Sequence, residues 1–303
     1  MKFHFYIVMS ALVLSTLLLS ACGSGPYVES GKLDVVVTTT ILGDVVGVIG
    51  GDRIELTVLL PVDADPHSFQ PTPRDLAAVA KADVVFINGL GLEESLEAVV
   101  ENAVENARVV AVSEGVETIS IDEEHEHGGA NPHVWMDPYN VIVWAENIAL
   151  NLGELDPHNV ESYTANSEAY IQELETLDAW ILEQVAALPE ESRKIVTDHD
   201  TFAYFIRRYG FELVGTIHPG YSTLAEPSAQ DIAALEDEIL ALNISVVFMG
   251  VSVNPNLAER IAEDTGTQLV FLYTGALSGK DGPASTYLEM MRYNVRVMVG
   301  ALE

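Results

Sequence analysis

Three histidines occupy positions from which a folded chain could bring them to one point. His67 lies in "DADPHSFQPTPRD", His133 in "ANPHVWMDPYN" and His199 in "VTDHDTFAYFIRRYG". Each of them follows or ends a stretch that predicts a buried strand, and none falls on a predicted helix face. Three neutral imidazoles that converge form a divalent-metal site. Such a site suits zinc, with nitrogen distances of about 2.0–2.1 Å.

Each histidine also has an ordinary structural explanation. His67 could cap the helix predicted after "PTP", and His133 could be a hydrogen-bonded loop residue. His199 stands between two aspartates, whose charge would simply raise its pKa. The location of all three at strand ends favours a shared site. His125 and His127, in "DEEHEHGG", indicate either a weak metal-collecting segment or a solvated loop.

Alternating strands and helices must position these side chains. Short β-branched runs predict four strands in each half of the chain. The first four are residues 33–40, 54–61, 82–89 and 107–115, and the second four are residues 192–199, 211–218, 244–250 and 267–275. Apolar strands that alternate with helices indicate an α/β fold with parallel sheets flanked by helices. Ligands bind beyond the carboxyl ends of such strands, which is where the three histidines fall.

A long helix is predicted between the two halves. Pro157 stands at its start, no further proline follows until Pro189, and apolar residues recur on one face. We therefore expect two similar lobes with the metal site in the cleft between them. Because a helix resists bending, the lobes should move little relative to each other. The predicted units are an N-terminal α/β lobe (32–155), a bridging helix (156–189) and a C-terminal α/β lobe (190–303).

The first residues predict export and membrane anchoring. Lys2 precedes an apolar run that is short for a membrane span, and small residues precede Cys22, the one cysteine of the chain. This pattern resembles a bacterial lipobox, which implies cleavage before Cys22 and lipid attachment to it. Residues 1–21 are then a signal peptide, and residues 22–31 are a flexible tether. We expect a protein held in the lipid bilayer by its acyl chains, on the extracytoplasmic face of the bacterial cell membrane.

The charge balance argues against two classes of partner. The chain has 46 acidic and 14 basic residues, which gives a formal net charge of −32. Such a surface repels nucleic acid and anionic lipid headgroups. We therefore expect no nucleic-acid partner. Separately, we expect the protein to be monomeric.

Several motifs together resemble a known family. The segments "DADPHSFQPTPRD", "NPHVWMDP", "DHDTFAYFIRRYGFELVGTI", "STLAEPSAQDIAAL" and "DGPASTYLEMMRYNV" are similar, in this order, to the metal-receptor lipoproteins of zinc/manganese ABC importers, the cluster 9 or cluster A-I solute-binding proteins. The resemblance covers essentially all of the mature chain. It implies two α/β lobes joined by a long helix, one divalent-metal site between them and delivery of the metal to an ABC permease. His67, His133 and His199 match the family's first three ligands.

The chain departs from the family at the fourth ligand. Many members place an aspartate in a segment similar to "YSDAL", whereas "FLYTGALSG" has Gly275 at that position. His218, at the end of a predicted strand, is a possible fourth ligand, or else a histidine hydrogen-bonded near Pro219. Glu226 and Asp281 are weaker candidates. Three imidazoles favour zinc as the cargo, because manganese prefers oxygen ligands.

The predicted function is therefore binding, with no chemical step. We expect an extracytoplasmic solute-binding protein that captures a divalent transition metal, zinc before manganese, and delivers it to the permease. The alternatives are a manganese receptor of the same importer class and a three-histidine zinc hydrolase, since an open zinc position can be catalytic. No "HExxH" motif occurs. A surface adhesin is compatible with the anchor but has no motif of its own.

Overall fold

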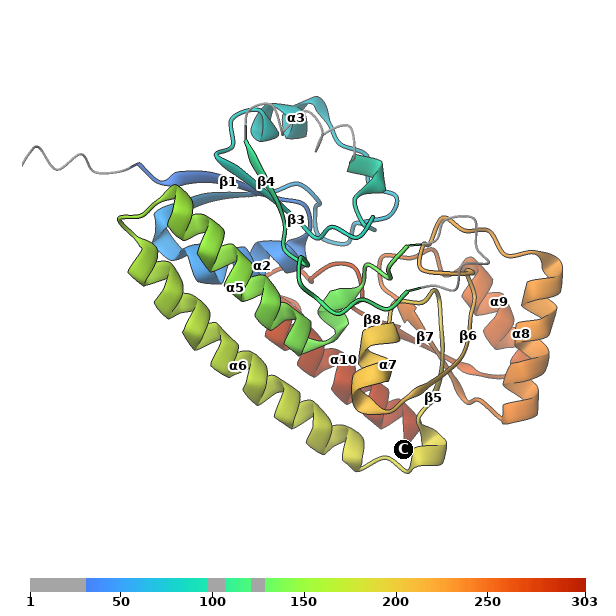
Figure 1. The fold of residues 1–303 in the computed structure, drawn as a ribbon. Coiled ribbons are helices and arrows are strands. Elements are labelled where there is room, and N and C mark those ends of the chain that lie inside the picture. The colour runs from blue at the N-terminus through green and yellow to red at the C-terminus, as the bar shows by residue number, and fades with distance from the viewer. Residues whose placement is uncertain (1–30, 97–106, 121–128) are drawn as a thin grey trace, which may run out of the picture. The chain divides into compact units, whose positions relative to one another are not determined.

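The computed structural model describes residues 31–96, 107–120 and 129–303 (Figure 1). The predicted signal peptide, Cys22 and the pair His125 and His127 lie outside the described residues. Within them, residues Lys32–Glu303 form one compact unit. No helix in this part of the chain is both long enough and apolar enough to cross a membrane.

Two four-stranded parallel sheets carry the fold. The first is ordered β2-β1-β3-β4 and the second β6-β5-β7-β8, so both lobes place their strands in the same way. The predicted α/β fold with two similar parallel sheets is thereby confirmed. Apolar β-branched residues form the central strands because both of their faces are covered. The strands are β1 (Leu33–Val37), β2 (Ile54–Val58), β3 (Val84–Ile87), β4 (Arg108–Ala111), β5 (Lys194–Thr197), β6 (Glu212–Thr216), β7 (Val246–Gly250) and β8 (Gln268–Leu272).

Helices cover these sheets, and several begin at a side-chain cap. The hydroxyls of Thr72 and Ser228 accept hydrogen bonds from the backbone N–H groups of Asp75 and Asp231. The carboxylates of these two aspartates accept hydrogen bonds from the backbone N–H groups of Thr72 and Ser228, so each pair forms a capping box. The α-helices are α2 (Thr40–Gly50), α3 (Pro73–Val79), α5 (Pro138–Leu155), α6 (Val160–Ala186), α7 (Ala203–Tyr209), α8 (Ala229–Leu242), α9 (Asn256–Thr265) and α10 (Tyr287–Leu302). Short 3₁₀ turns are η1 (Gly51–Arg53), η2 (Glu94–Leu96), η3 (Val134–Met136) and η4 (Glu190–Ser192).

The long helix that lies between the two sheets in chain order is α6, which packs against α5, α2 and α10 (Figure 1). It begins at Val160, three residues after the predicted start at Pro157, because residues 156–159 form a turn in which Asn159 donates to the Asp156 backbone and carboxylate. Its buried stripe is Tyr163, Tyr170, Leu174, Leu177 and Ile181.

A polar contact fixes α6 to the second lobe. The guanidinium of Arg208 on α7 donates two hydrogen bonds, of 2.7 and 2.8 Å, to the buried Asp178 carboxylate on α6. The Tyr209 hydroxyl donates a third at 2.9 Å. A bidentate pair of this kind holds one geometry, so it fixes where the helix meets α7.

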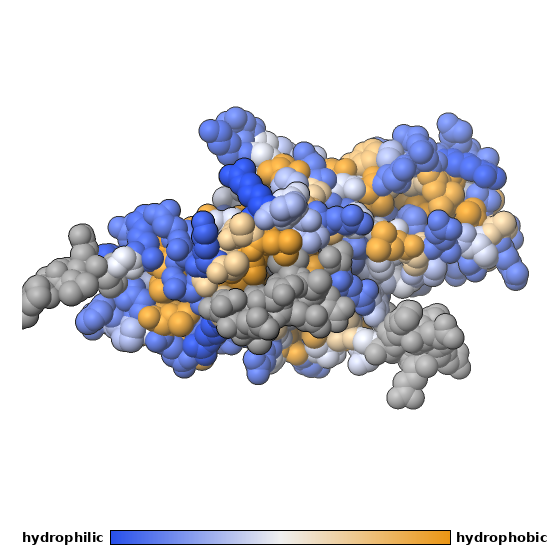
Figure 2. Space-filling model, turned by 90° about the horizontal axis from the view of Figure 1, so that it is seen from above, coloured by the Kyte–Doolittle hydropathy of each residue, from blue (hydrophilic) through white to orange (hydrophobic). Residues whose placement is uncertain are grey.

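One apolar core runs through both lobes. The largest cluster joins strand residues of the first sheet, such as Val35 and Phe86, to α6 and to Ile195 and Phe248 of the second sheet. Two smaller clusters lie under helices of the individual lobes. Figure 2 shows one face of the molecule, on which hydrophilic residues surround smaller apolar areas. A shared core means that the lobes cannot separate without exposing apolar surface.

Candidate metal site

The three predicted ligands come from three loops beyond strand ends. His67 lies between β2 and α3, His133 immediately precedes η3, and His199 follows β5 by two residues. Their residues are 9%, 1% and 3% exposed, respectively, so all three are buried. Among the described residues they form the one group of three or more histidine, cysteine or acidic side chains whose ligand atoms lie within 4.8 Å of one another.

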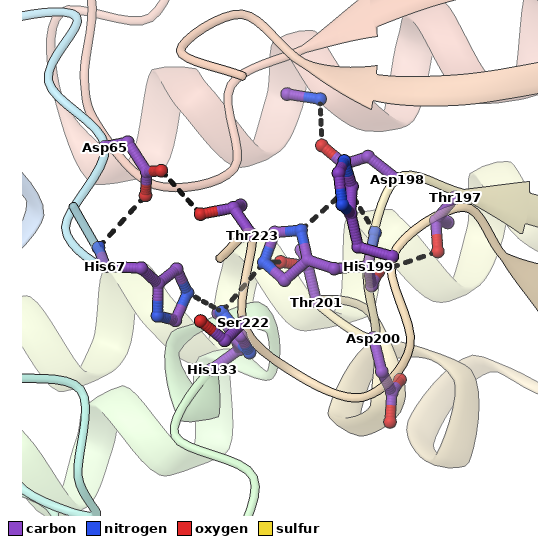
Figure 3. A network of polar contacts seen from close by, with 12 residues as sticks. Asp65, His67, His133, Thr197, Asp198, His199, Asp200, Thr201, Ser222 and Thr223 are labelled. Carbon is purple, nitrogen blue, oxygen red and sulfur yellow. Dashed lines mark hydrogen bonds and ion pairs between the residues drawn. The ribbon is translucent and has the colours of Figure 1, made fainter. Parts of the chain in front are cut away.

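The imidazoles face one another through their Nε2 atoms (Figure 3). The Nε2 atom of His133 lies 3.0 Å from that of His67 and 3.1 Å from that of His199. A tetrahedral zinc ion with Zn–N distances of about 2.0–2.1 Å separates its ligand nitrogens by about 3.4 Å. The two separations from His133 are therefore within a few tenths of an ångström of that value, and all three ligand atoms lie within 4.8 Å of one another.

Hydrogen bonds on the far side of two rings decide which nitrogen faces the centre. His133 Nδ1 lies 2.9 Å from Asn131 Oδ1, and His199 Nδ1 lies 2.9 Å from Asp198 Oδ1. Both oxygens accept only, so in the neutral rings each Nδ1 carries the hydrogen and each Nε2 a lone pair. Two such lone pairs at 3.1 Å repel each other, and a cation between them removes the repulsion.

The partners of these rings are themselves fixed. Asn131 accepts from the His133 backbone at 3.0 Å and donates to the Asp200 carbonyl at 2.7 Å. The carboxylate of Asp198 accepts from the backbones of His199 at 2.7 Å and Gly250 at 2.8 Å. Burial alone would raise the pKa of Asp198, but the nearby His199 and these hydrogen bonds outweigh it and lower that pKa. Asp198 is thus an ionised carboxylate that orients His199, a candidate ligand.

Burial favours the neutral form of two of the histidines, His67 and His133. Burial, followed by the charge of His199, lowers the pKa of His67 to about 4. Burial, with the charges of His199 and His67, lowers the pKa of His133 well below its usual value. Neutral imidazole is the form that binds metal. Thr201 adds a hydroxyl whose Oγ1 lies 2.7 Å from His199 Nε2.

The cavity between the rings accommodates one small ion. Its volume is about 10 Å³, roughly that of one water-sized sphere. The lining residues are Asp65, Pro66, His67, His133, His199, Thr201, Ser252, Val253, Thr274 and Gly275. Gly275, which has no side chain to donate, therefore lies at the site.

The structure does not bring the possible fourth ligands to this cavity. His218 lines a neighbouring cavity of about 450 Å³, and its Nδ1 lies 2.9 Å from the Ala225 carbonyl oxygen. Glu226 and Asp281 are exposed and line neither cavity. Three residues that the sequence did not predict do take part, namely Asn131, Asp198 and Thr201. All three stand within two residues of a candidate ligand, which is the signal that could have found them.

The chain is similar to proteins that are named for metal uptake or metal binding. A family model described as "ZnuA: Zinc-uptake complex component A periplasmic" matches residues 35–301. The manganese-binding lipoprotein MntA of Halalkalibacterium halodurans is 36% identical over 304 residues, 99% of this chain and 98% of that protein. The iron ABC transporter substrate-binding lipoprotein MtsA of Streptococcus pyogenes is 32% identical over 295 residues, 93% of each chain.

Solved structures agree with these relatives. The periplasmic zinc-binding protein TroA from Treponema pallidum superposes with a TM-score of 0.84 at 30% identity, over 90% of this chain and 99% of that one. A manganese-bound periplasmic metal-binding protein from Candidatus Liberibacter asiaticus superposes with a TM-score of 0.79 at 26% identity, over 89% and 99%. The names of these proteins include zinc, manganese and iron, so likeness alone does not select the metal.

Proposed function

The chain belongs to the family of zinc-uptake component A, the metal-binding substrate-binding proteins of ABC transporters, and we propose that it captures Zn²⁺ as its cargo through His67, His133 and His199. It is a receptor and not an enzyme. The observation that carries the choice of metal is the meeting of three imidazole Nε2 atoms with no carboxylate in the group. Nitrogen donors favour zinc, whereas manganese prefers more oxygen ligands.

Capture needs little rearrangement of the three histidines. Asn131 and Asp198 already hold two rings with their Nε2 lone pairs inward. The ion replaces the contacts between the Nε2 atoms and the contact of Thr201 with His199. Ligands that are oriented beforehand lose little entropy on binding, which favours high affinity.

Manganese is the second candidate, because MntA, one of the relatives, is named for it. Calorimetric titration of the metal-free chain from Gly23 onward, with Zn²⁺ and with Mn²⁺ at one pH, separates the two. Tight zinc binding and much weaker manganese binding support the proposal. Comparable affinities would refute zinc selectivity and make manganese the leading cargo, since zinc normally outcompetes manganese at a nitrogen-rich site.

The cellular context follows from the family. A substrate-binding component of an ABC importer implies a permease partner, and relatives are named as lipoproteins. We propose that this chain acts as a monomer, tethered outside the membrane by lipid on Cys22. Labelled fatty acid supplied to growing cells should be incorporated into the parent protein and not into Cys22→Ser. Equal incorporation into the two proteins would contradict a lipid anchor at Cys22.

A further inference from the structure

One carboxylate lines the cavity of the three histidines, and it belongs to Asp65. The lining residues include no other acidic side chain. Asp65 Oδ1 accepts from the His67 backbone at 3.0 Å, and Oδ2 accepts from the Thr223 hydroxyl at 2.6 Å (Figure 3). Ser68 donates to Oδ2 at 3.3 Å. An ionised carboxylate accepts about four hydrogen bonds, so one acceptor position is left.

Pro66 occupies the space beside Gly275. A Cβ atom at position 275 would lie 2.9 Å from Pro66 Cδ and 3.7 Å from Ser252 Oγ. A side chain at 275 and the present position of the proline ring therefore exclude each other. The absence of a side chain at 275 lets the Asp65–Pro66 segment approach the site, and that segment brings a carboxylate to the cavity.

This carboxylate does not reach the metal position directly. Its oxygens are not in the group of ligand atoms that lie within 4.8 Å of one another. Any interaction between Asp65 and a metal on the three Nε2 atoms therefore needs a bridging water molecule. The neighbouring 450 Å³ cavity shares Asp65, Ser252 and Val253 with the site, which provides a route for solvent to this position.

We propose that water completes the metal's coordination and that Asp65 accepts a hydrogen bond from that water. The proposal rests on the capture of a divalent metal by the three histidines. Asp65 is then a positioning residue that supplies negative charge from outside the ligand shell. It partly offsets the two positive charges of an ion held by three neutral ligands.

The first test compares two aspartates of the same loop in the chain from Gly23 onward, because Lys32–Glu303 is a compact unit by itself. Asp65→Asn keeps an oxygen that can accept from the His67 backbone and removes the charge. It should weaken Zn²⁺ binding by about 10- to 100-fold in chelator competition. The control is Asp63→Asn, at an exposed residue with φ of 64° that asparagine tolerates. Its affinity should equal that of the parent.

The second test separates charge from general loosening of the site. Azide added to the Co²⁺-bound parent should shift its visible d–d absorption, because the fourth ligand is exchangeable water. In Asp65→Asn, azide should bind about tenfold more tightly, since a negative charge beside the anion's position has gone. A variant that had merely lost structure would bind both Zn²⁺ and azide more weakly.

A failure of the proposed function and a failure of the inference about Asp65 give different results. A parent that binds no Zn²⁺ overturns the proposed function, and this inference with it. A parent that binds Zn²⁺ beside an Asp65→Asn variant of equal affinity overturns the inference alone. So does a Co²⁺ spectrum that azide leaves unchanged in the parent, because the fourth ligand would then be a protein group.

Discussion

At the scale of single residues, the site consists of ligands and of the groups that fix their orientation. The sequence predicted His67, His133 and His199 because each follows or ends a predicted strand. It did not predict Thr201, because a hydroxyl two residues after a histidine is unremarkable until the backbone turns back on itself. In the structure the Thr201 backbone donates to the His199 carbonyl at 2.7 Å, and this turn brings the hydroxyl to His199 Nε2.

Removal of any one ligand should abolish tight binding. His67→Ala, His133→Ala and His199→Ala each take away one of three donors, and we expect Zn²⁺ affinity to fall by more than about 100-fold. The exposed His158, in the turn before α6, provides the control, because His158→Ala should bind as the parent does. Calorimetric titration with Zn²⁺ measures the affinities of the three ligand variants and of the control. If all three variants bound zinc normally, these residues would not be the site.

The buried histidines should make the metal-free protein sensitive to acid. The pKa of His67 is about 4 in the folded protein and about 6.5 when unfolded, so the unfolded chain binds an extra proton between these values. The free energy of unfolding is therefore unaffected by the titration of His67 above pH 6.5, and it decreases as the pH falls from 6.5 towards 4. Over this window the free energy of unfolding of the parent should fall by about 1.4 kcal/mol more per pH unit than that of His67→Ala. Denaturant unfolding of the metal-free proteins measures both. Equal slopes would contradict the depressed pKa.

At the scale of elements, all eight strands were predictable, because central strands of a parallel sheet are continuous apolar runs. Helices α5 and α10 were not predicted from the sequence. The buried residues of α5 cover a broad face that includes Asn140, Asn151 and Gly153, so its periodicity is weak until the neighbouring α6 is in place. The start of α6 was misplaced because Pro157 suits both a first helical turn and the tight turn that is observed.

Gly275 lies against Pro66 of another loop, at the position where many members of the family have an aspartate. Gly275→Asp adds an oxygen donor but places its Cβ against the Pro66 ring, so we expect the free energy of unfolding to fall by about 1–3 kcal/mol. Affinity for Mn²⁺ should rise relative to Zn²⁺. Gly275→Ala is the matched control, which should carry the strain without the change in metal preference. An aspartate variant with unaltered preference would show that its carboxylate does not reach the ion.

At the scale of the whole molecule, the shared core predicts small lobe movements. Spin labels at Lys81→Cys and Glu238→Cys, both exposed and in different lobes, report the distance between lobes. Zn²⁺ should change that distance by less than about 2 Å, because α6 and the apolar core join both sheets. A change of several ångströms would indicate hinge closure in place of local ordering.

Three imidazoles of one buried site are proposed to hold the cargo. X-ray absorption at the zinc edge of the Zn²⁺-bound protein counts them. We predict three imidazole nitrogens at about 2.0–2.1 Å with one oxygen at a similar distance, and the loss of one imidazole in His133→Ala. A spectrum with fewer than three histidines in the parent, or the same spectrum in parent and variant, would contradict the site.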